Sequence, residues 1–154
     1  MRAVVQRVKN ASVTIENKLY SSIEQGYLVL FGAEKGDTKK QADWMANKLS
    51  VLRCFPDENG KMNLGLEQIG GEVLVVSQFT LYGNCRKGRR PSFTEAAGPE
   101  LGNRLYEKFL SCCEELGYPP QHGLFGADMK VESVNDGPVT LILDTDQLLH
   151  EPRR

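Results

Sequence analysis

Very few side chains in this sequence have the types and spacing of a known acid/base, nucleophilic or metal site. The 154 residues contain two histidines, His122 and His150, and four cysteines with no C-x-x-C pair. Zinc sites require clustered His and Cys ligands, so a metal centre is not expected. A Ser–His or Cys–His nucleophile is equally disfavoured, since His122 stands alone in a Pro-rich loop and His150 in a charged tail. Chemistry must therefore come from less usual groups.

One candidate group is the segment "SQFT", which consists of Ser77, Gln78, Phe79 and Thr80. It follows the apolar run "GGEVLVV", which predicts a buried strand, and it precedes a glycine-containing loop. Polar groups at the end of a buried strand lie where ligands commonly bind to a sheet, on the loops that the sheet positions. The alternative is that Phe and Thr are simply good strand residues and continue the strand.

A second candidate is the basic run "RKGRR", which contains Arg86, Lys87, Arg89 and Arg90. The formal net charge of the chain is −1, so any attraction to nucleic acid must be local. Basic side chains in a glycine-containing loop can contact a phosphate backbone. A solvated loop without a partner is the alternative interpretation.

A third candidate is the Gly137-Pro138 pair in "NDGPVTLILD". Proline cannot donate a ladder hydrogen bond, so it must lie at a strand start, an edge or a bulge. One interpretation is a hairpin turn at Asp136-Gly137, between the runs "MKVESV" and "VTLIL". In the other, the segment is shaped so that its carbonyls face a cationic group, and a cis X-Pro bond, found in about 5–6% of cases, would favour this.

The elements that must position these groups alternate between strand and helix patterns. Strands are predicted in "RAVVQRVKNASVTIE", "LYSSI", "GYLVLFGA", "GGEVLVVSQFTLYG", "MKVESV" and "VTLIL". Helices are predicted after a capping box at Thr38 and Gln41, and from Pro99 to a stop at Gly117. The order predicts an α+β fold, with a mixed or antiparallel sheet and two helices, in one domain spanning residues 1–154.

The sequence also limits the cellular context that we expect. The opening "MRAVVQRVKN" lacks the apolar core of a signal peptide, and no apolar run approaches about 18 residues. We therefore expect a soluble, cytoplasmic protein with no membrane partner. Its cysteines, Cys54, Cys85, Cys112 and Cys113, are expected to be reduced thiols.

Two of these motifs carry a resemblance to a known family. "SQFTL" and "NDGPVT" are similar to the two signature motifs of the D-aminoacyl-tRNA deacylases, and they occur in the same order. "GKMNL", "RKGRRPSF" and "FGADMKV", which contains Met129, resemble the segments between and around them. The resemblance extends from "MRAVVQRV" to "LDT", nearly the whole chain.

The resemblance implies a homodimer that hydrolyses the ester bond of D-aminoacyl-tRNA, and of tRNA mischarged with glycine. No metal, cofactor or DNA partner is implied. Gly137 and Pro138 would be cis and reach into the partner's active site, Arg7 would hold them in place, and Met129 would contact the substrate. Arg86, Lys87, Arg89 and Arg90 would bind RNA.

Within the "SQFT" motif, Ser77, Gln78, Phe79 and Thr80 would form the catalytic group. An aminoacyl ester is already activated, so orientation and oxyanion stabilisation can suffice. Backbone N–H groups at Gln78 and Phe79 are the expected oxyanion donors. Thr80 is expected to position the substrate, although it could also attack directly. The rival functions are a noncatalytic RNA-binding protein and a small-molecule esterase.

Overall fold

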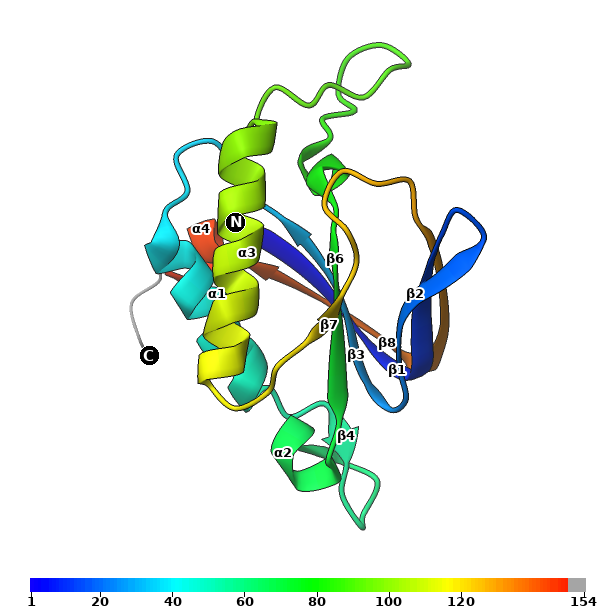
Figure 1. The fold of residues 1–154 in the computed structure, drawn as a ribbon. Coiled ribbons are helices and arrows are strands. Elements are labelled where there is room, and N and C mark those ends of the chain that lie inside the picture. Colours follow the sequence, from blue (N-terminus) through cyan, green and yellow to red (C-terminus); the bar gives the residue numbers. More distant parts are fainter. Residues whose placement is uncertain (150–154) are drawn as a thin grey trace.

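The computed structural model describes residues 1–149, so His150 lies outside the described residues. Its centre is a six-stranded sheet with the order β2-β1-β3-β6-β7, and β8 pairs with β1 off this path (Figure 1). Contacts between β3, β6 and β7 are parallel, and those of β1 with β2, β3 and β8 are antiparallel. The sheet is therefore mixed. The strands are β1 Arg2–Ile15, β2 Lys18–Ile23, β3 Gly26–Gly32, β6 Glu72–Ser77, β7 Gln121–His122 and β8 Lys130–Asp144.

Two long helices, α1 (Lys39–Val51) and α3 (Pro99–Glu115), cover one face of the sheet (Figure 1). Both begin as predicted, α1 with the Thr38 and Gln41 capping box and α3 with Pro99 in its first turn. Their apolar sides bury a core together with Tyr27, Phe31 and Phe55, all at most 2% exposed. Burial of apolar surface on this face is the main force that fixes the helices to the sheet.

The prediction of two helices is incomplete. Two further helices of one turn each occur, α2 (Leu66–Ile69) and α4 (Thr145–Leu148). Four residues are too few to produce a helical hydrophobic period, which is why the sequence pattern did not predict them. A small hairpin of β4 (Phe55–Pro56) and β5 (Met62–Leu64) completes the fold.

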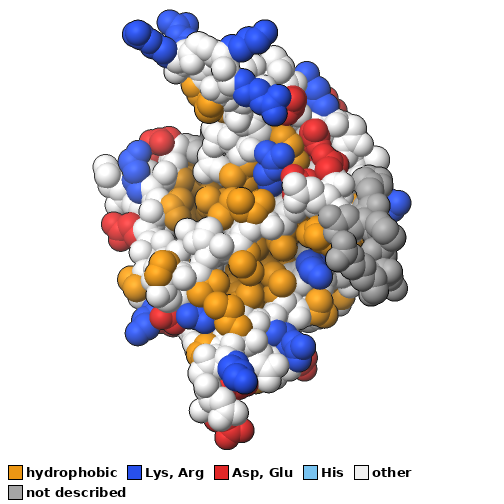
Figure 2. All heavy atoms as spheres, turned by 180° about the vertical axis from the view of Figure 1, so that it is seen from behind, with side chains coloured by type: hydrophobic (Ala, Val, Ile, Leu, Met, Phe, Trp, Pro, Cys, Tyr) orange, Lys and Arg blue, Asp and Glu red, His pale blue; other side chains and the backbone are white. Residues whose placement is uncertain are grey.

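Within residues 1–149, the opposite face of the sheet carries no helix. Side chains alternate between the two faces along each strand, and Val4, Leu30 and Ile142 point to the face away from the helices. Val4 on β1 is paired with Leu30 on β3 and with Ile142 on β8, so the three side chains are neighbours. Ile142 is 70% exposed, and its two neighbours are half-buried. We call Val4, Leu30 and Ile142 the apolar row. Figure 2 shows hydrophobic side chains gathered on this face of the molecule.

The hairpin interpretation of Asp136-Gly137 is wrong. Residues 130–144 form one strand, β8, and both of its halves pair with the same strand, β1. The register jumps from Val8 opposite Asn135 to Gln6 opposite Thr140. Residues 136–139 therefore bulge from the ladder without partner residues on β1, which is one of the positions open to proline.

The remaining expectations concern the cysteines and the membrane. Cys54, Cys85, Cys112 and Cys113 are all free thiols, as predicted, and only Cys85 is exposed. Within residues 1–149, none of the helices combines the length and apolar character needed to cross a bilayer.

Candidate active site

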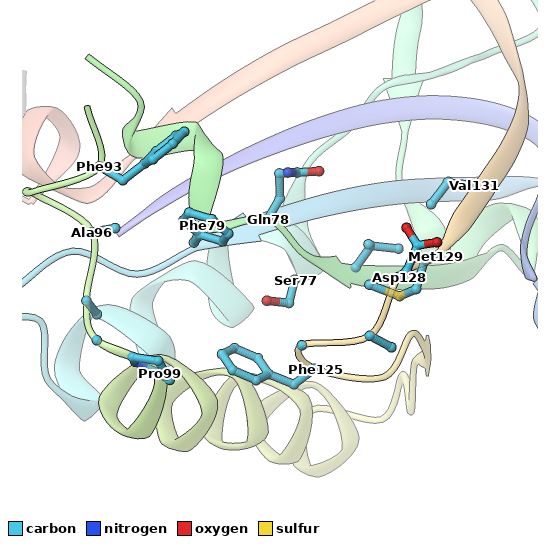
Figure 3. A pocket seen from close by; sticks show the side chains of 15 residues that line it. Ser77, Gln78, Phe79, Phe93, Ala96, Pro99, Phe125, Asp128, Met129 and Val131 are labelled. Carbon is cyan, nitrogen blue, oxygen red and sulfur yellow. The ribbon is translucent and has the colours of Figure 1, made fainter. Parts of the chain in front are cut away.

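A cavity of about 650 Å³ lies at the carboxyl end of β6 (Figure 3). Ser77, Gln78 and Phe79 stand where the strand ends, and Met129 lines the cavity with them. Residues 93–99, which lead into α3, form one wall, and residues 125–131, which lead into β8, form another. The structure thus brings together four of the predicted site residues.

The local structure of "SQFT" differs from a continued strand. Pairing with β3 ends at Ser77, and Phe79–Tyr82 form a 3₁₀ helix, which we call η1. The Gln78 N–H donates to the Phe31 carbonyl at 2.7 Å, so it is not available as an oxyanion donor. The expectation that Gln78 supplies an oxyanion donor is therefore wrong. The N–H groups of Phe79 and Thr80 remain as candidate oxyanion donors, since the first N–H groups of a helix have no partner within it.

Thr80 is exposed and lies beside the cavity rather than on its lining. Its hydroxyl accepts a hydrogen bond from the Gln78 side-chain amide. Phe79 is 54% exposed and packs edge-to-face on Phe93, with 5.1 Å between ring centroids. These contacts fix the side chains of η1 at the mouth of the cavity.

Charged groups are scarce around the cavity. Asp128 is its one carboxylate, and this side chain is exposed and pairs with Lys130 at 3.0 Å. No group of three or more metal-ligating side chains occurs in the part of the chain that the structure describes. The cavity can orient a substrate and stabilise an oxyanion, but it offers no buried general base.

Sequence reasoning missed the aromatic walls of the cavity, Phe93 and Phe125. Both lie in irregular loops, where hydrophobic periodicity carries no information. The loop of Phe125 is fixed by Tyr106 of α3, whose single O–H lies within hydrogen-bond distance of two carbonyls, those of Val75 at 3.1 Å and Gly123 at 3.2 Å. The resemblance includes both residues within "RKGRRPSF" and "FGADMKV" but assigns them no role, and Pro99, predicted as the helix start, lies beside them in the lining.

Gly137 and Pro138 do not line this cavity, and neither does Arg7. The peptide bond between Gly137 and Pro138 is cis, as the resemblance implied. Arg7 contacts the segment as expected, because its Nε donates to the Asp136 carbonyl at 2.9 Å while Nη1 donates to the Cys54 carbonyl at 2.7 Å. We call residues 136–139 the Gly-Pro segment.

The basic run forms a loop that projects from the body of the protein (Figure 2). Paired backbone hydrogen bonds between Asn84 and Ser92, of 2.7 and 2.9 Å, close its base. Side chains of Arg86, Lys87, Arg89 and Arg90 are all exposed. We call residues 85–91 the basic loop.

Behind the cavity wall lies a segment that contains Glu34. The Ala97 N–H donates to the Ala33 carbonyl at 3.0 Å, and the Lys35 N–H donates to the Glu95 carbonyl at 3.0 Å. Burial, together with a hydrogen bond to Asp146, raises the pKa of Glu34 to about 7. Glu34 is therefore a group behind this wall that changes charge near neutral pH.

Comparison with known proteins identifies the family. The model of the D-Tyr-tRNA(Tyr) deacylase family matches residues 4–144. A D-aminoacyl-tRNA deacylase of Thermosipho africanus is 55% identical over 148 residues, which cover 96% of this chain and 99% of that protein. One from Geobacter sp. strain M21 is 59% identical over 145 residues, covering 94% and 97%.

Solved structures have the same fold. The structure of the c-Myc DNA unwinding element binding protein has a TM-score of 0.88 and 40% identity, covering 94% of this chain and 98% of that one. A probable eukaryotic D-amino acid tRNA deacylase has a TM-score of 0.78 at 17% identity, covering 92% and 97%, and this likeness concerns the fold alone. Taken with the match over residues 4–144, these relatives show that the chain belongs to the D-aminoacyl-tRNA deacylase family.

Proposed function

We propose that this protein hydrolyses the ester bond that joins a D-amino acid to the terminal ribose of tRNA. Water adds to the ester carbonyl carbon to form a tetrahedral oxyanion. The ester C–O bond then breaks, and the ribose oxygen leaves with a proton. The products are a free D-amino acid and tRNA, and the cytoplasm, where tRNA is charged and used, is the expected location.

The observation that carries this proposal is the composition of the cavity at the end of β6. Its walls are apolar and aromatic, its backbone donors lie at the start of η1, and its one carboxylate is exposed. Such a site suits an activated ester, whose hydrolysis requires positioning and oxyanion stabilisation more than a strong base.

Within the cavity, the roles follow from the contacts. The Phe79 N–H is the candidate oxyanion donor, because the N–H of Gln78 is engaged by Phe31. Thr80 positions the substrate, since no described histidine, lysine or carboxylate contacts its hydroxyl to act as a base. Ser77 and Met129 contact the substrate from the floor and the wall.

A second copy of the chain completes the site in this proposal. The Gly-Pro segment lies outside its own chain's cavity and lacks ladder partners, so the carbonyls of Gly137 and Pro138 are available to another molecule, while that of Asp136 accepts from Arg7. The exposed apolar row offers a surface for association with a second copy on the uncovered face of the sheet. A two-fold dimer would carry each segment into the partner's cavity, where the carbonyls of Gly137 and Pro138 bind the substrate ammonium.

Chirality follows from the same arrangement. Main chain packed closely behind the substrate Cα leaves no space for an L side chain, while a D side chain points out of the site. Such a filter does not depend on which D side chain is present. It also does not exclude glycine, which has no side chain, so hydrolysis of mischarged glycyl-tRNA is part of the proposal.

The test is the loss of ester from D- and L-aminoacyl-tRNA of the same tRNA, with D- and L-tyrosyl adenosine esters measured beside them. Fast hydrolysis of the D ester of tRNA with retention of the L ester supports the proposal. Binding of tRNA without turnover would instead indicate an RNA-binding protein. If the adenosine esters are hydrolysed as fast as the tRNA esters, the tRNA body plays no part, and the protein is a small-molecule esterase.

A further inference from the structure

A second cavity, of about 390 Å³, lies at the base of the basic loop. It is lined by Arg2 from the start of β1, by Tyr82 at the end of η1, and by the stretch from Gly83 to Arg86. Two arginines face one carboxylate, Glu95, which is exposed. The lining is therefore net positive, unlike that of the first cavity.

The guanidinium of Arg2 is held in a fixed position. Its Nε donates to the Asp144 carboxylate at 3.1 Å and Nη1 donates to the Leu81 carbonyl at 2.8 Å. The guanidinium carbon also lies 4.5 Å from the centre of the Tyr82 ring. Since the side chain remains 35% exposed, its free edge is accessible from the cavity. A fixed guanidinium loses little conformational freedom when it binds an anion.

Arg86 approaches the same cavity from the loop. Its backbone N–H donates to the Asn84 side-chain oxygen at 3.0 Å, and Asn84 is itself tied to Ser92. This turn fixes the first residues of the basic loop. Lys87, Arg89 and Arg90 lie further along the loop and do not line the cavity.

The two cavities are neighbours. Phe79 of η1 lines the first and Tyr82 of η1 lines the second. A 3₁₀ helix rises about 2 Å per residue, so these positions are about 6 Å apart along its axis. The same closeness appears at Gly83 of the second cavity, where a Cβ would lie 3.1 Å from the ring of Phe93 in the first. Neighbouring parts of one nucleotide strand can therefore occupy both cavities.

From these positions we infer that the second cavity is a subsite for a phosphodiester of the last nucleotides of tRNA, bound by Arg2 and Arg86. This inference rests on the proposed function. Arginine binds phosphate through paired N–H donors, and such contacts fix the register of a nucleic acid without reading its bases. The subsite would set the depth to which the terminal ester enters the first cavity. The outer cations of the basic loop would contact the more distant acceptor stem.

The experiment compares D-tyrosyl esters of three carriers, namely adenosine, the trinucleotide CpCpA and whole tRNA. The trinucleotide adds two phosphodiesters and two cytidines to the terminal adenosine, and nothing of the acceptor stem. Arg86→Ala is the primary variant, because the Arg86 side chain is exposed and the change removes no core contact. Lys61→Ala, an exposed cation in the distant β4–β5 hairpin, is the matched control.

We expect Arg86→Ala to lower kcat/KM for the CpCpA ester about tenfold more than for the adenosine ester, mainly through KM, as for one lost charged hydrogen bond. The slope of log(kcat/KM) against log[salt] for the CpCpA ester should fall by up to about one. Arg86→Lys should recover part of the loss. Lys61→Ala should match the wild type on all three carriers.

Two outcomes would overturn the subsite. In one, Arg86→Ala lowers activity on whole tRNA alone, which places its contact on the acceptor stem. In the other, it lowers activity equally on adenosine and CpCpA esters, which assigns it a structural role. Arg2→Lys, which keeps the charge but not the paired donors, should also affect CpCpA more than adenosine. If the wild type hydrolyses none of the D esters, the proposed function itself fails, and that result is distinct from both.

Discussion

Replacing Gly137 with alanine is expected to abolish most of the activity at a moderate cost in stability. Gly137 has a φ of +134°, a conformation that L residues rarely adopt. A Cβ at this position would lie 2.9 Å from Val139 Cγ2 and 3.0 Å from Arg7 Nη2. Both distances are shorter than normal contacts, so the Gly-Pro segment and the side chains of Val139 and Arg7 must move apart.

The size of both effects can be worked out from this geometry. A residue held in a disfavoured backbone region costs about 1–3 kcal/mol. For a chain of this length each kcal/mol lowers Tm by about 2–4 °C, so Tm should fall by about 2–12 °C. A displacement of about 1 Å in a positioning group can lower the rate on the order of 100-fold. The variant should therefore remain folded at 25 °C and lose about 99% of kcat/KM for D-aminoacyl-tRNA.

The assay is kcat/KM for D-aminoacyl-tRNA together with thermal unfolding of the same preparation. Gly60→Ala is the matched control, since Gly60 also has a positive φ, of +76°, and has no atom within 4 Å of the Cβ position. It lies in the β4–β5 turn and should lose some stability without losing activity. If Gly137→Ala is destabilised but retains wild-type kcat/KM, the Gly-Pro segment is not part of the active site.

Three further predictions follow from other contacts. Thr80→Ala should lower kcat about tenfold and leave measurable turnover, as expected for one lost hydrogen bond, and a covalent acyl-Thr80 trapped by mass spectrometry would overturn its positioning role. Ile142→Asp should shift the proposed dimer to monomers in sedimentation at micromolar concentration, because an unpaired carboxylate is costly to bury, whereas unchanged sedimentation would remove the apolar row from the proposed interface. Glu34 binds its proton more tightly in the folded state, where its pKa is about 7, than at its ordinary pKa of 4.5. The stability that this protonation contributes is complete below pH 4.5 and is lost as the pH rises through about 7. Chemical denaturation of Glu34→Gln should show a smaller decrease in stability over that range than the wild type, and parallel curves would contradict the assignment.

Local signals predicted the parts of the fold that local contacts determine. The capping box at Thr38 and Gln41 places two hydrogen-bonding side chains at a helix start, and Pro99 fixes a first-turn dihedral. The apolar run at Gly26–Gly32 is a strand buried at every position except the half-buried Leu30, as its composition indicates. In each case the cause lies within a few residues of the element.

The errors have causes that are distant in the sequence. Phe79 and Thr80 have strand propensity, but β6 loses its partner when β3 ends, and the chain turns into η1. Asp136-Gly137 has the composition of a hairpin turn, but β1 is long enough to pair with both halves of β8. The walls with Phe93 and Phe125 meet through tertiary packing that no local pattern encodes. Residue types at the site were therefore predictable, while its enclosure was not.

The central claim, that two chains build one deacylase site, is tested most directly with a purified heterodimer of two inactive variants. Co-expressed under separate affinity tags, one chain carries Gly137→Ala and the other Phe79→Asp, which puts a carboxylate at the mouth of the cavity without disturbing the core. In a shared site, two-fold symmetry leaves one cavity with two wild-type contributions and the other with both changes. The account predicts that the heterodimer hydrolyses D-aminoacyl-tRNA at about half the wild-type rate per dimer, while both parent homodimers remain near 1%. A heterodimer as inactive as its parents would contradict it, because a site within a single chain would then carry a defect in every copy.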